Sequence, residues 1–154
     1  MTSAALHYLL DTNILLRLSK RNRPEVPEIR NALRSLFVMR ARLYYTSQNL
    51  REFWNVLTRP ADRNGFGLST AQADQEARRI ERAFLFLSDN DAIHKEWRSL
   101  VVAHSVSGVQ VHDAHLVAAM KVHGITHLLT LNIQDFSRYT EITAVHPARI
   151  VAQK

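Results

Sequence analysis

The sequence predicts a three-layer α/β/α domain with a short central parallel sheet and more helix than strand. Short apolar runs alternate along the chain with longer stretches in which apolar residues recur every three or four positions. Strands that are separated by helices in this way usually form a parallel sheet. The composition also fits a folded domain, because 46% of the 154 residues are hydrophobic and 22% are charged. We expect residues 1–154 to form a single domain.

The first half of the chain contains two predicted strands, each followed by helix. The apolar run Ala4–Leu10 stops at Asp11, which predicts a strand that leads directly into a helix. Pro60 stops the last helix of this half, because the residue before a proline avoids helical geometry. In chain order, the predicted elements are a strand at Ala4–Leu10, a helix carrying Ile14, Leu15 and Leu18, a helix over Ile29–Phe37, a strand at Leu43–Thr46 and a helix over Leu50–Leu57.

The second half contains three predicted helices and two predicted strands. Apolar residues at helical spacing predict one long helix over Ala73–Leu87. Gly124 closes a later helix, because glycine adopts the left-handed conformation that is common at helix ends. The predicted elements are a loop at Asn64–Gly67, helices over Ala73–Leu87 and Ile93–His104, a turn at Ser107–Gly108, a helix from Asp113 to Gly124, a strand at Ile125–Thr130, a loop or short helical turn over Asn132–Tyr139 and a strand at Ile142–His146.

The composition excludes several classes of protein. The chain has no Cys, so it is not a disulfide scaffold and has no Cys-based zinc site, iron–sulfur cluster or cysteine nucleophile. No run of eighteen apolar residues predicts a membrane span, and the first ten residues lack the basic flank of a signal peptide. We expect a cytoplasmic protein that does not interact with a membrane.

Positive charge is concentrated in the first half of the chain. The net charge is +6, and residues 12–63 contain eleven Lys and Arg against four acidic residues. A basic region on a domain of this size predicts a polyanionic partner such as a nucleic acid. The alternative is a basic, soluble surface that has no partner.

Polar and acidic residues stand at the ends of the predicted strands. Asp11 ends the first strand, Glu52 lies in the first turns of the helix after the second, and Asp113 begins the helix that precedes the third. Asn132 and Asp135 follow that third strand. Functional sites of open parallel sheets lie outside the carboxyl ends of the strands, so we expect these residues to converge there.

Each acidic residue also has a purely structural interpretation. Asp11 could cap a helix, Glu52 could complete a capping box with Asn49, and Asp113 could favour the positive end of its helix. Asp135 could cap the turn that follows it. If the four converge instead, their mutual repulsion calls for a cation, and oxygen ligands without Cys suit Mg²⁺ or Mn²⁺. With a basic half, the pattern then predicts metal-assisted hydrolysis of a nucleic-acid phosphodiester.

An ordered set of motifs extends over nearly the whole chain. The segments are Leu10–Leu16, Ser47 with Arg51–Val56, Thr58–Pro60, Asn64–Ser69, His112–Met120 and Leu129–Phe136. Together they resemble PIN-domain ribonucleases, and among these the VapC-type toxins of bacterial toxin–antitoxin pairs. The resemblance implies a PIN-like fold and a metal-dependent endoribonuclease.

The resemblance also implies roles for individual residues. Asp11, Glu52 and Asp113 would hold Mg²⁺ or Mn²⁺. The family's fourth acidic position falls on Asn132, which removes one charge, and Asp135 could compensate for it. Hydroxyl and polar side chains would orient the ligands or water, and basic side chains would hold the RNA backbone. The orienting residues would be Thr12, Asn13, Ser47, Thr130 and His115. The residues that hold RNA would be Arg17, Lys20, Arg51 and Arg59.

Partners follow from the same resemblance. Such toxins act on RNA, are neutralised by a small antitoxin and usually form homodimers. One apolar cluster is richer than a single buried helix face requires, so part of it could be an antitoxin or dimer surface, although ordinary core is the alternative. The cluster comprises Leu33, Leu36, Phe37, Val38 and Met39.

Other functions compete with the ribonuclease. Asp11-x-Asn13 after a strand comes close to the motif of a haloacid-dehalogenase-like phosphatase, in which Asp11 would be the nucleophile. Because Asn132 weakens the acidic set, a catalytically weak RNA-binding module is another alternative. His112 and His115 have the spacing of zinc ligands on a helix, but further ligands would have to converge on them.

Overall fold

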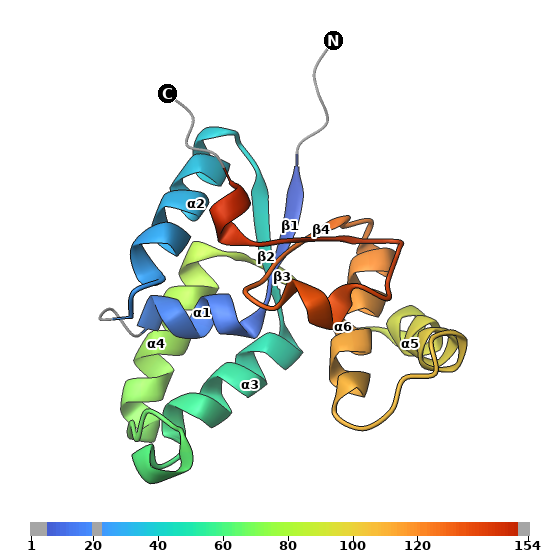
Figure 1. Ribbon diagram of the computed structural model, residues 1–154. Helices are drawn as coiled ribbons and strands as arrows, with labels where there is room; N and C mark the ends of the chain where they lie inside the picture. Colours follow the sequence, from blue (N-terminus) through green and yellow to red (C-terminus); the bar gives the residue numbers. More distant parts are fainter. Residues whose placement is uncertain (1–5, 20–22, 151–154) are drawn as a thin grey trace.

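A computed structural model of the protein describes residues 6–19 and 23–150. Five parallel strands form one sheet in these residues, in the spatial order β3-β2-β1-β4-β5 (Figure 1). The first strand of the chain is therefore the central one. The strands are β1 (His7–Leu10), β2 (Arg42–Thr46), β3 (Leu85–Leu87), β4 (His127–Leu129) and β5 (Thr143–Val145).

Helices cover both faces of this sheet. Four of them pack on one side, and α5 and α6 pack on the other (Figure 1). None of the helices in the described ranges has the length and apolar character needed to cross a membrane. The α-helices are α1 (Thr12–Ser19), α2 (Val26–Val38), α3 (Ser47–Thr58), α4 (Thr70–Ala83), α5 (Asp91–Ala103) and α6 (Gln110–His123), and the short 3₁₀ helices are η1 (Ala61–Arg63), η2 (Ile133–Phe136) and η3 (Pro147–Arg149).

The two apolar layers meet across the central strand. Tyr8 and Leu10 of β1 belong to the core beneath α1–α4, whereas Leu9 belongs to the core beneath α5 and α6. Successive side chains of a strand point to opposite faces, so one strand contributes to both layers. This arrangement confirms the predicted three-layer α/β/α fold.

One predicted element is wrong. The sequence predicts a single helix over Ala73–Leu87, but α4 ends at Ala83 and the next residues form β3. β3 pairs in parallel with β2, with Leu85 opposite Tyr44 and Leu87 opposite Thr46. Backbone pairing with a distant strand here overrides a local pattern that continues the helical spacing.

Smaller differences concern the ends of elements. α6 begins at Gln110, so Asp113 lies in the first turn of the helix and does not open it. Gly124 ends α6 with a φ of 72°, as predicted. Residues 1–5 are outside the described residues, and the start predicted for the first strand at Ala4 falls among them.

Candidate active site

Three parallel strands end at one edge of the sheet, and they lead into several of the predicted site residues. β1 leads into Asp11, β2 leads into the helix that carries Glu52, and β4 leads into Thr130 and Asn132. The Asp11 backbone N–H donates to the Leu129 carbonyl at 2.9 Å, which holds the ends of β1 and β4 together. This is the edge at which parallel α/β sheets bind ligands.

The Asp11 carboxylate is buried and held in a fixed orientation. It is 9% exposed, and its Oδ1 accepts from the backbone N–H of Thr12 at 2.8 Å. Its Oδ2 accepts from the Thr130 hydroxyl at 2.8 Å and from Asn13 Nδ2 at 3.5 Å. Burial raises the pKa of Asp11, the bonds from Thr130 and Thr12 lower it, and the charges of Glu52 and Asp135 raise it.

Glu52 is held in the same manner from the other side. Its Oε2 accepts from the Thr12 hydroxyl at 2.8 Å, and its Oε1 accepts from Gln48 Nε2 at 2.8 Å. The Thr12 hydroxyl itself accepts from Asn49 Nδ2 at 3.1 Å. Thr12 therefore connects the two carboxylates, through its backbone to Asp11 and through its side chain to Glu52.

The capping interpretation of Glu52 is wrong. The N-terminus of α3 is capped by Thr46, whose hydroxyl accepts from the Asn49 N–H at 3.1 Å. The Thr46 N–H donates back to Asn49 Oδ1 at 2.9 Å, so Asn49 completes the capping box. Glu52 has no part in this cap, and its carboxylate is directed to Thr12 and Gln48.

Asp113 lacks the support that Asp11 and Glu52 receive. Within the described part of the chain, no hydrogen bond is donated to its carboxylate. Burial and then the charges of Asp11, Asp135 and Glu52 raise the pKa of Asp113 to about 7, against a small opposing effect of Arg138. These couplings mean that carboxylates from four separate segments of the chain share one electrostatic environment.

Asn132 and Asp135 contribute unequally. Both side chains are exposed, and the Asn132 backbone N–H donates to the Thr130 hydroxyl at 3.0 Å. The charge of Asp135 raises the pKa of both Asp11 and Asp113. Of these two residues, Asp135 is therefore the one that adds negative charge near Asp11 and Asp113.

The oxygen donors of this site bear on whether it can bind a divalent cation. Among residues 6–19 and 23–150, no group of three or more acidic or histidine side chains is arranged so that it could hold a metal ion. Mg²⁺ commonly binds through only one or two carboxylates and keeps several waters. A buried, oriented Asp11 beside an unsatisfied Asp113 fits such a partly hydrated ion. The zinc alternative has no comparable support, because His115 Nδ1 instead lies 2.8 Å from Gln48 Oε1.

The remaining predicted residues are more dispersed. The Ser47 hydroxyl accepts from Arg51 at 2.8 Å, and among the described residues it contacts no carboxylate. Arg17 forms an ion pair with Glu25, and Arg59 donates to the Asn64 carbonyl at 3.0 Å. Arg51 is exposed and has no acidic partner within the described ranges. Lys20 lies outside the described residues.

Two residues of the site were not predicted from the sequence. Gln48 is buried and bridges Glu52, His115 and the His112 carbonyl. Asn49 is fully buried and connects Thr46 with Thr12. One signal was available, since Gln48 precedes Glu52 by four positions, the spacing at which helical side chains meet.

Comparison with known proteins gives a family and a set of similar folds. The family model of the PIN domain matches residues 8–142. No curated protein matches the chain.

Among solved structures, a chain of VapBC2 from Rickettsia felis, crystallised with a promoter DNA fragment, has a TM-score of 0.70 at 14% identity, with 92% of this chain and 98% of that chain covered. VapBC-1 from nontypeable Haemophilus influenzae gives a TM-score of 0.69 at 18% identity, with 94% of this chain and 100% of that chain covered. Mycobacterium tuberculosis VapC20, a toxin that cleaves the sarcin–ricin loop, gives a TM-score of 0.58 at 16% identity, with 79% of this chain and 86% of that chain covered. At these identities the likeness concerns the fold.

Proposed function

Because the chain belongs to the PIN-domain family, we propose that it is a metal-dependent endoribonuclease that hydrolyses phosphodiester bonds of RNA. The observation that carries the proposal is geometric: at the carboxyl edge of a parallel sheet, Thr12 joins the carboxylates of Asp11 and Glu52, and Thr130 donates to Asp11. The charges of Asp11, Glu52 and Asp135 also raise the pKa of Asp113. Repulsion of this kind is relieved by a divalent cation, and that cation suits phosphodiester hydrolysis.

In this proposal Asp11, Glu52 and Asp113 would hold one Mg²⁺ or Mn²⁺, and Asn132 or Asp135 would close the site through water. Such an ion supplies a bound water of lowered pKa and stabilises negative charge on phosphodiester oxygens. Thr12 and Thr130 keep Asp11 and Glu52 in fixed orientations, since each donates a hydroxyl hydrogen bond to one of them. Arg51 is the exposed cation that is available to an RNA phosphate.

The proposed biological role is that of the toxin in a toxin–antitoxin pair. Support comes from the fold shared with chains of VapBC complexes. Part of the apolar cluster predicted from the sequence is exposed, with Phe37 at 58% and Val38 at 63%, whereas Leu33 and Leu36 are in the core. We propose the exposed part, with Met39, as a surface for an antitoxin or for a second copy of the chain in a homodimer.

The test is RNA cleavage by the purified protein. A 5′-labelled RNA is incubated with Mg²⁺ or with EDTA, and Asp11→Asn is compared with the wild type. The matched control is Asp62→Asn, which removes an exposed carboxylate in η1. We expect Mg²⁺-dependent cleavage that Asp11→Asn abolishes and Asp62→Asn retains. Cleavage that persists in Asp11→Asn refutes the assigned site.

The same purified proteins also test the two alternative functions, the phosphatase and the RNA-binding module. A covalent phosphate trapped on Asp11 would favour the phosphatase, although both oxygens of this carboxylate accept hydrogen bonds from the protein. RNA binding without any metal-dependent cleavage would favour the RNA-binding module.

A further inference from the structure

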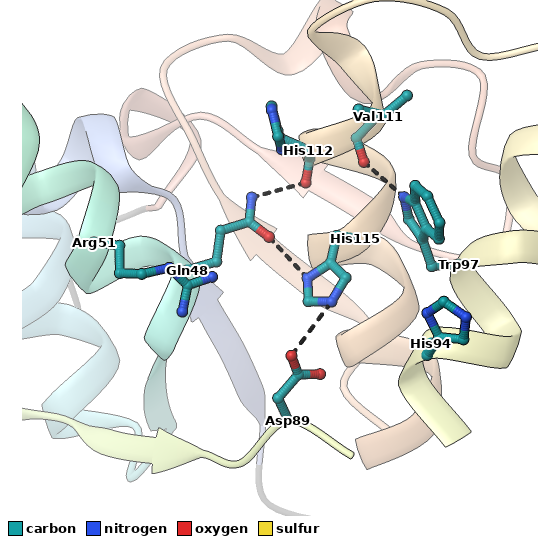
Figure 2. A pocket seen from close by; sticks show the side chains of 8 residues that line it. All are labelled: Gln48, Arg51, Asp89, His94, Trp97, Val111, His112 and His115. Atoms are coloured by element: carbon teal, nitrogen blue, oxygen red, sulfur yellow. Dashed lines mark hydrogen bonds and ion pairs between the residues drawn. The ribbon is translucent and has the colours of Figure 1, made fainter. Parts of the chain in front are cut away.

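A cavity opens beside the acidic residues, between α3, α5 and α6 (Figure 2). Its volume of about 430 Å³ is within the usual range of small-molecule pockets. Side chains from all three helices line it, including Gln48, Arg51, Trp97 and His115. One carboxylate, that of Asp89, also lines it and lies 3.5 Å from His115 Nε2. The metal site proposed above makes no use of this space.

One wall of the cavity is aromatic. Figure 2 shows Trp97 and His94 on the side opposite Arg51 and Gln48. The centroids of the Trp97 and His94 rings are 5.9 Å apart, and Trp97 Nε1 donates to the Val111 carbonyl at 2.8 Å. That hydrogen bond fixes the orientation of an indole ring that is only partly buried. A fixed, accessible ring is a platform on which a planar group can stack.

The opposite wall carries positive charge. Arg51 is exposed on α3, and in the described part of the chain it has one hydrogen bond, from Nη1 to the Ser47 hydroxyl. A guanidinium has five N–H donors, so most of its donors remain available to a phosphate. The cavity therefore combines a stacking surface with a phosphate-binding cation, which are the two groups that a nucleotide requires.

Gln48 connects this cavity to the acidic residues. It lines the cavity, and its Nε2 donates both to Glu52 Oε1 at 2.8 Å and to the His112 carbonyl at 2.9 Å. Its Oε1 lies 2.8 Å from His115 Nδ1. Because an amide oxygen can only accept, His115 Nδ1 carries the hydrogen and donates it to Oε1. A ligand in the cavity is thus separated from Glu52 by a single side chain.

We propose that this cavity receives the base of an RNA nucleotide next to the bond that is cut, with Trp97 stacking on the base and Arg51 binding its phosphate. The inference rests on the proposed ribonuclease function. Single-stranded RNA is recognised mainly through bases that leave the stack and pack on aromatic or guanidinium planes. The cavity then sets a base preference beside the cleavage site.

Fluorescence of Trp97 tests whether the cavity binds an RNA base, and the measurement does not depend on cleavage. The chain has two tryptophans, so Trp54→Phe leaves Trp97 as the only reporter. AMP, GMP, CMP, UMP and short single-stranded RNAs are titrated in EDTA. We expect saturable quenching that differs among the four bases and that RNA produces at lower concentration than the mononucleotides. In Trp97→Phe, which leaves Trp54 as reporter, the quenching is expected to disappear.

Three outcomes would overturn the proposal. These are no quenching by any RNA, quenching by mononucleotides alone, and quenching by arginine amide but not by nucleotides. The last would identify a protein side chain as the occupant.

Two variants measure the contributions of the walls. Trp97→Leu is expected to weaken RNA binding about five-fold or more, since stacking contributes about 1–3 kcal/mol per base. Because Trp97→Leu also removes the bond to Val111, exposed Arg51→Ala provides a second measurement that spares the fold. Its matched control is Arg98→Ala. Arg98 is exposed like Arg51, but it lies on α5 and does not line the cavity. Equal binding by Arg51→Ala and Arg98→Ala contradicts the role of Arg51.

Mapping of RNA ends separates this inference from the ribonuclease proposal. If the wild type cuts RNA and Trp97→Leu cuts with the same base preference, the cavity inference is wrong and the ribonuclease stands. If RNA quenches Trp97 but no cleavage occurs, the cavity binds RNA, whereas the ribonuclease proposal and the assigned position beside a cut bond both fail.

Discussion

Asp113→Asn is expected to abolish cleavage and at the same time to stabilise the metal-free protein near neutral pH. In the folded chain, burial and three neighbouring carboxylates raise the pKa of Asp113 from 3.8 to about 7. Because the folded state holds this proton more tightly than the unfolded state, stability falls as the pH rises from about 4 to 7. An asparagine at this position has no proton to lose and gains no negative charge as the pH rises, so the variant avoids this penalty.

The magnitude follows from the size of the pKa shift. A pKa shift of one unit corresponds to 1.36 kcal/mol, so the shift of Asp113 sets an upper limit of about 4 kcal/mol on the gain in the free energy of unfolding. Asp113 is only partly buried, so solvent screening reduces the gain, and its favourable place in the first turn of α6 reduces it further. We expect a net gain of about 1–2 kcal/mol, or roughly 3–6 °C in Tm for a chain of this length.

The assay is thermal unfolding in EDTA at several pH values, followed by circular dichroism. The difference between Asp113→Asn and the wild type should be largest near pH 8 and smaller near pH 5. Saturating Mg²⁺ should stabilise the wild type selectively and narrow the difference, because an ion that binds only the folded state raises its stability. Asp62→Asn, in exposed η1, controls for the loss of any one carboxylate. An Asp113→Asn variant no more stable than the wild type near pH 8 in EDTA would refute the electrostatic reasoning.

Three further predictions concern neighbouring residues. Thr130→Val removes the hydroxyl that lowers the pKa of Asp11, so the acidic limb of the pH profile of cleavage should move to higher pH; an unmoved limb would contradict this role. Gln48→Leu leaves Glu52 without one of its two donors and should reduce cleavage about 10–100-fold, measured as kcat/KM for a labelled RNA; unchanged cleavage would show that Gln48 does not orient Glu52. Gly65→Ala places a Cβ 1.9 Å from the Arg59 carbonyl oxygen and should destabilise the fold by about 1–3 kcal/mol, measured by urea unfolding; an unchanged midpoint would contradict this close approach.

Local patterns predicted most of the fold, and one long-range pairing explains the main error. The helices after β1 and β2 follow from apolar residues at helical spacing, and such stripes are local properties of the sequence. Ile80, Phe84 and Leu87 continue that spacing into β3, so the sequence alone favours helix there. Leu87 instead lies opposite Thr46, and this pairing depends on a strand some forty residues away that no local window contains.

The positions of the candidate site residues were predictable, but the hydrogen bonds among them were not. A parallel sheet brings the ends of its strands to one edge, so Asp11, Glu52 and Asp113 could be expected to converge. The orientation of Glu52 depends instead on Thr12 and Gln48, from two different helices. Whether a polar side chain is buried and which group it contacts is decided by tertiary packing, which the sequence pattern does not contain.

The three proposed metal ligands divide into a pair whose oxygens both accept hydrogen bonds, Asp11 and Glu52, and a third, Asp113, that accepts none in the described residues. This asymmetry bears on the proposed metal site. Asp11 and Glu52 each receive hydrogen bonds on both oxygens, which keeps them oriented before any ligand binds. Had Asp113 been satisfied equally well, a cation would gain little by replacing those donors. Because Asp113 is left with three like charges and no donor in the described residues, neutralising it is favourable. The instability of the empty site and its affinity for a cation would then have the same physical origin, and Asp113→Asn should remove both together.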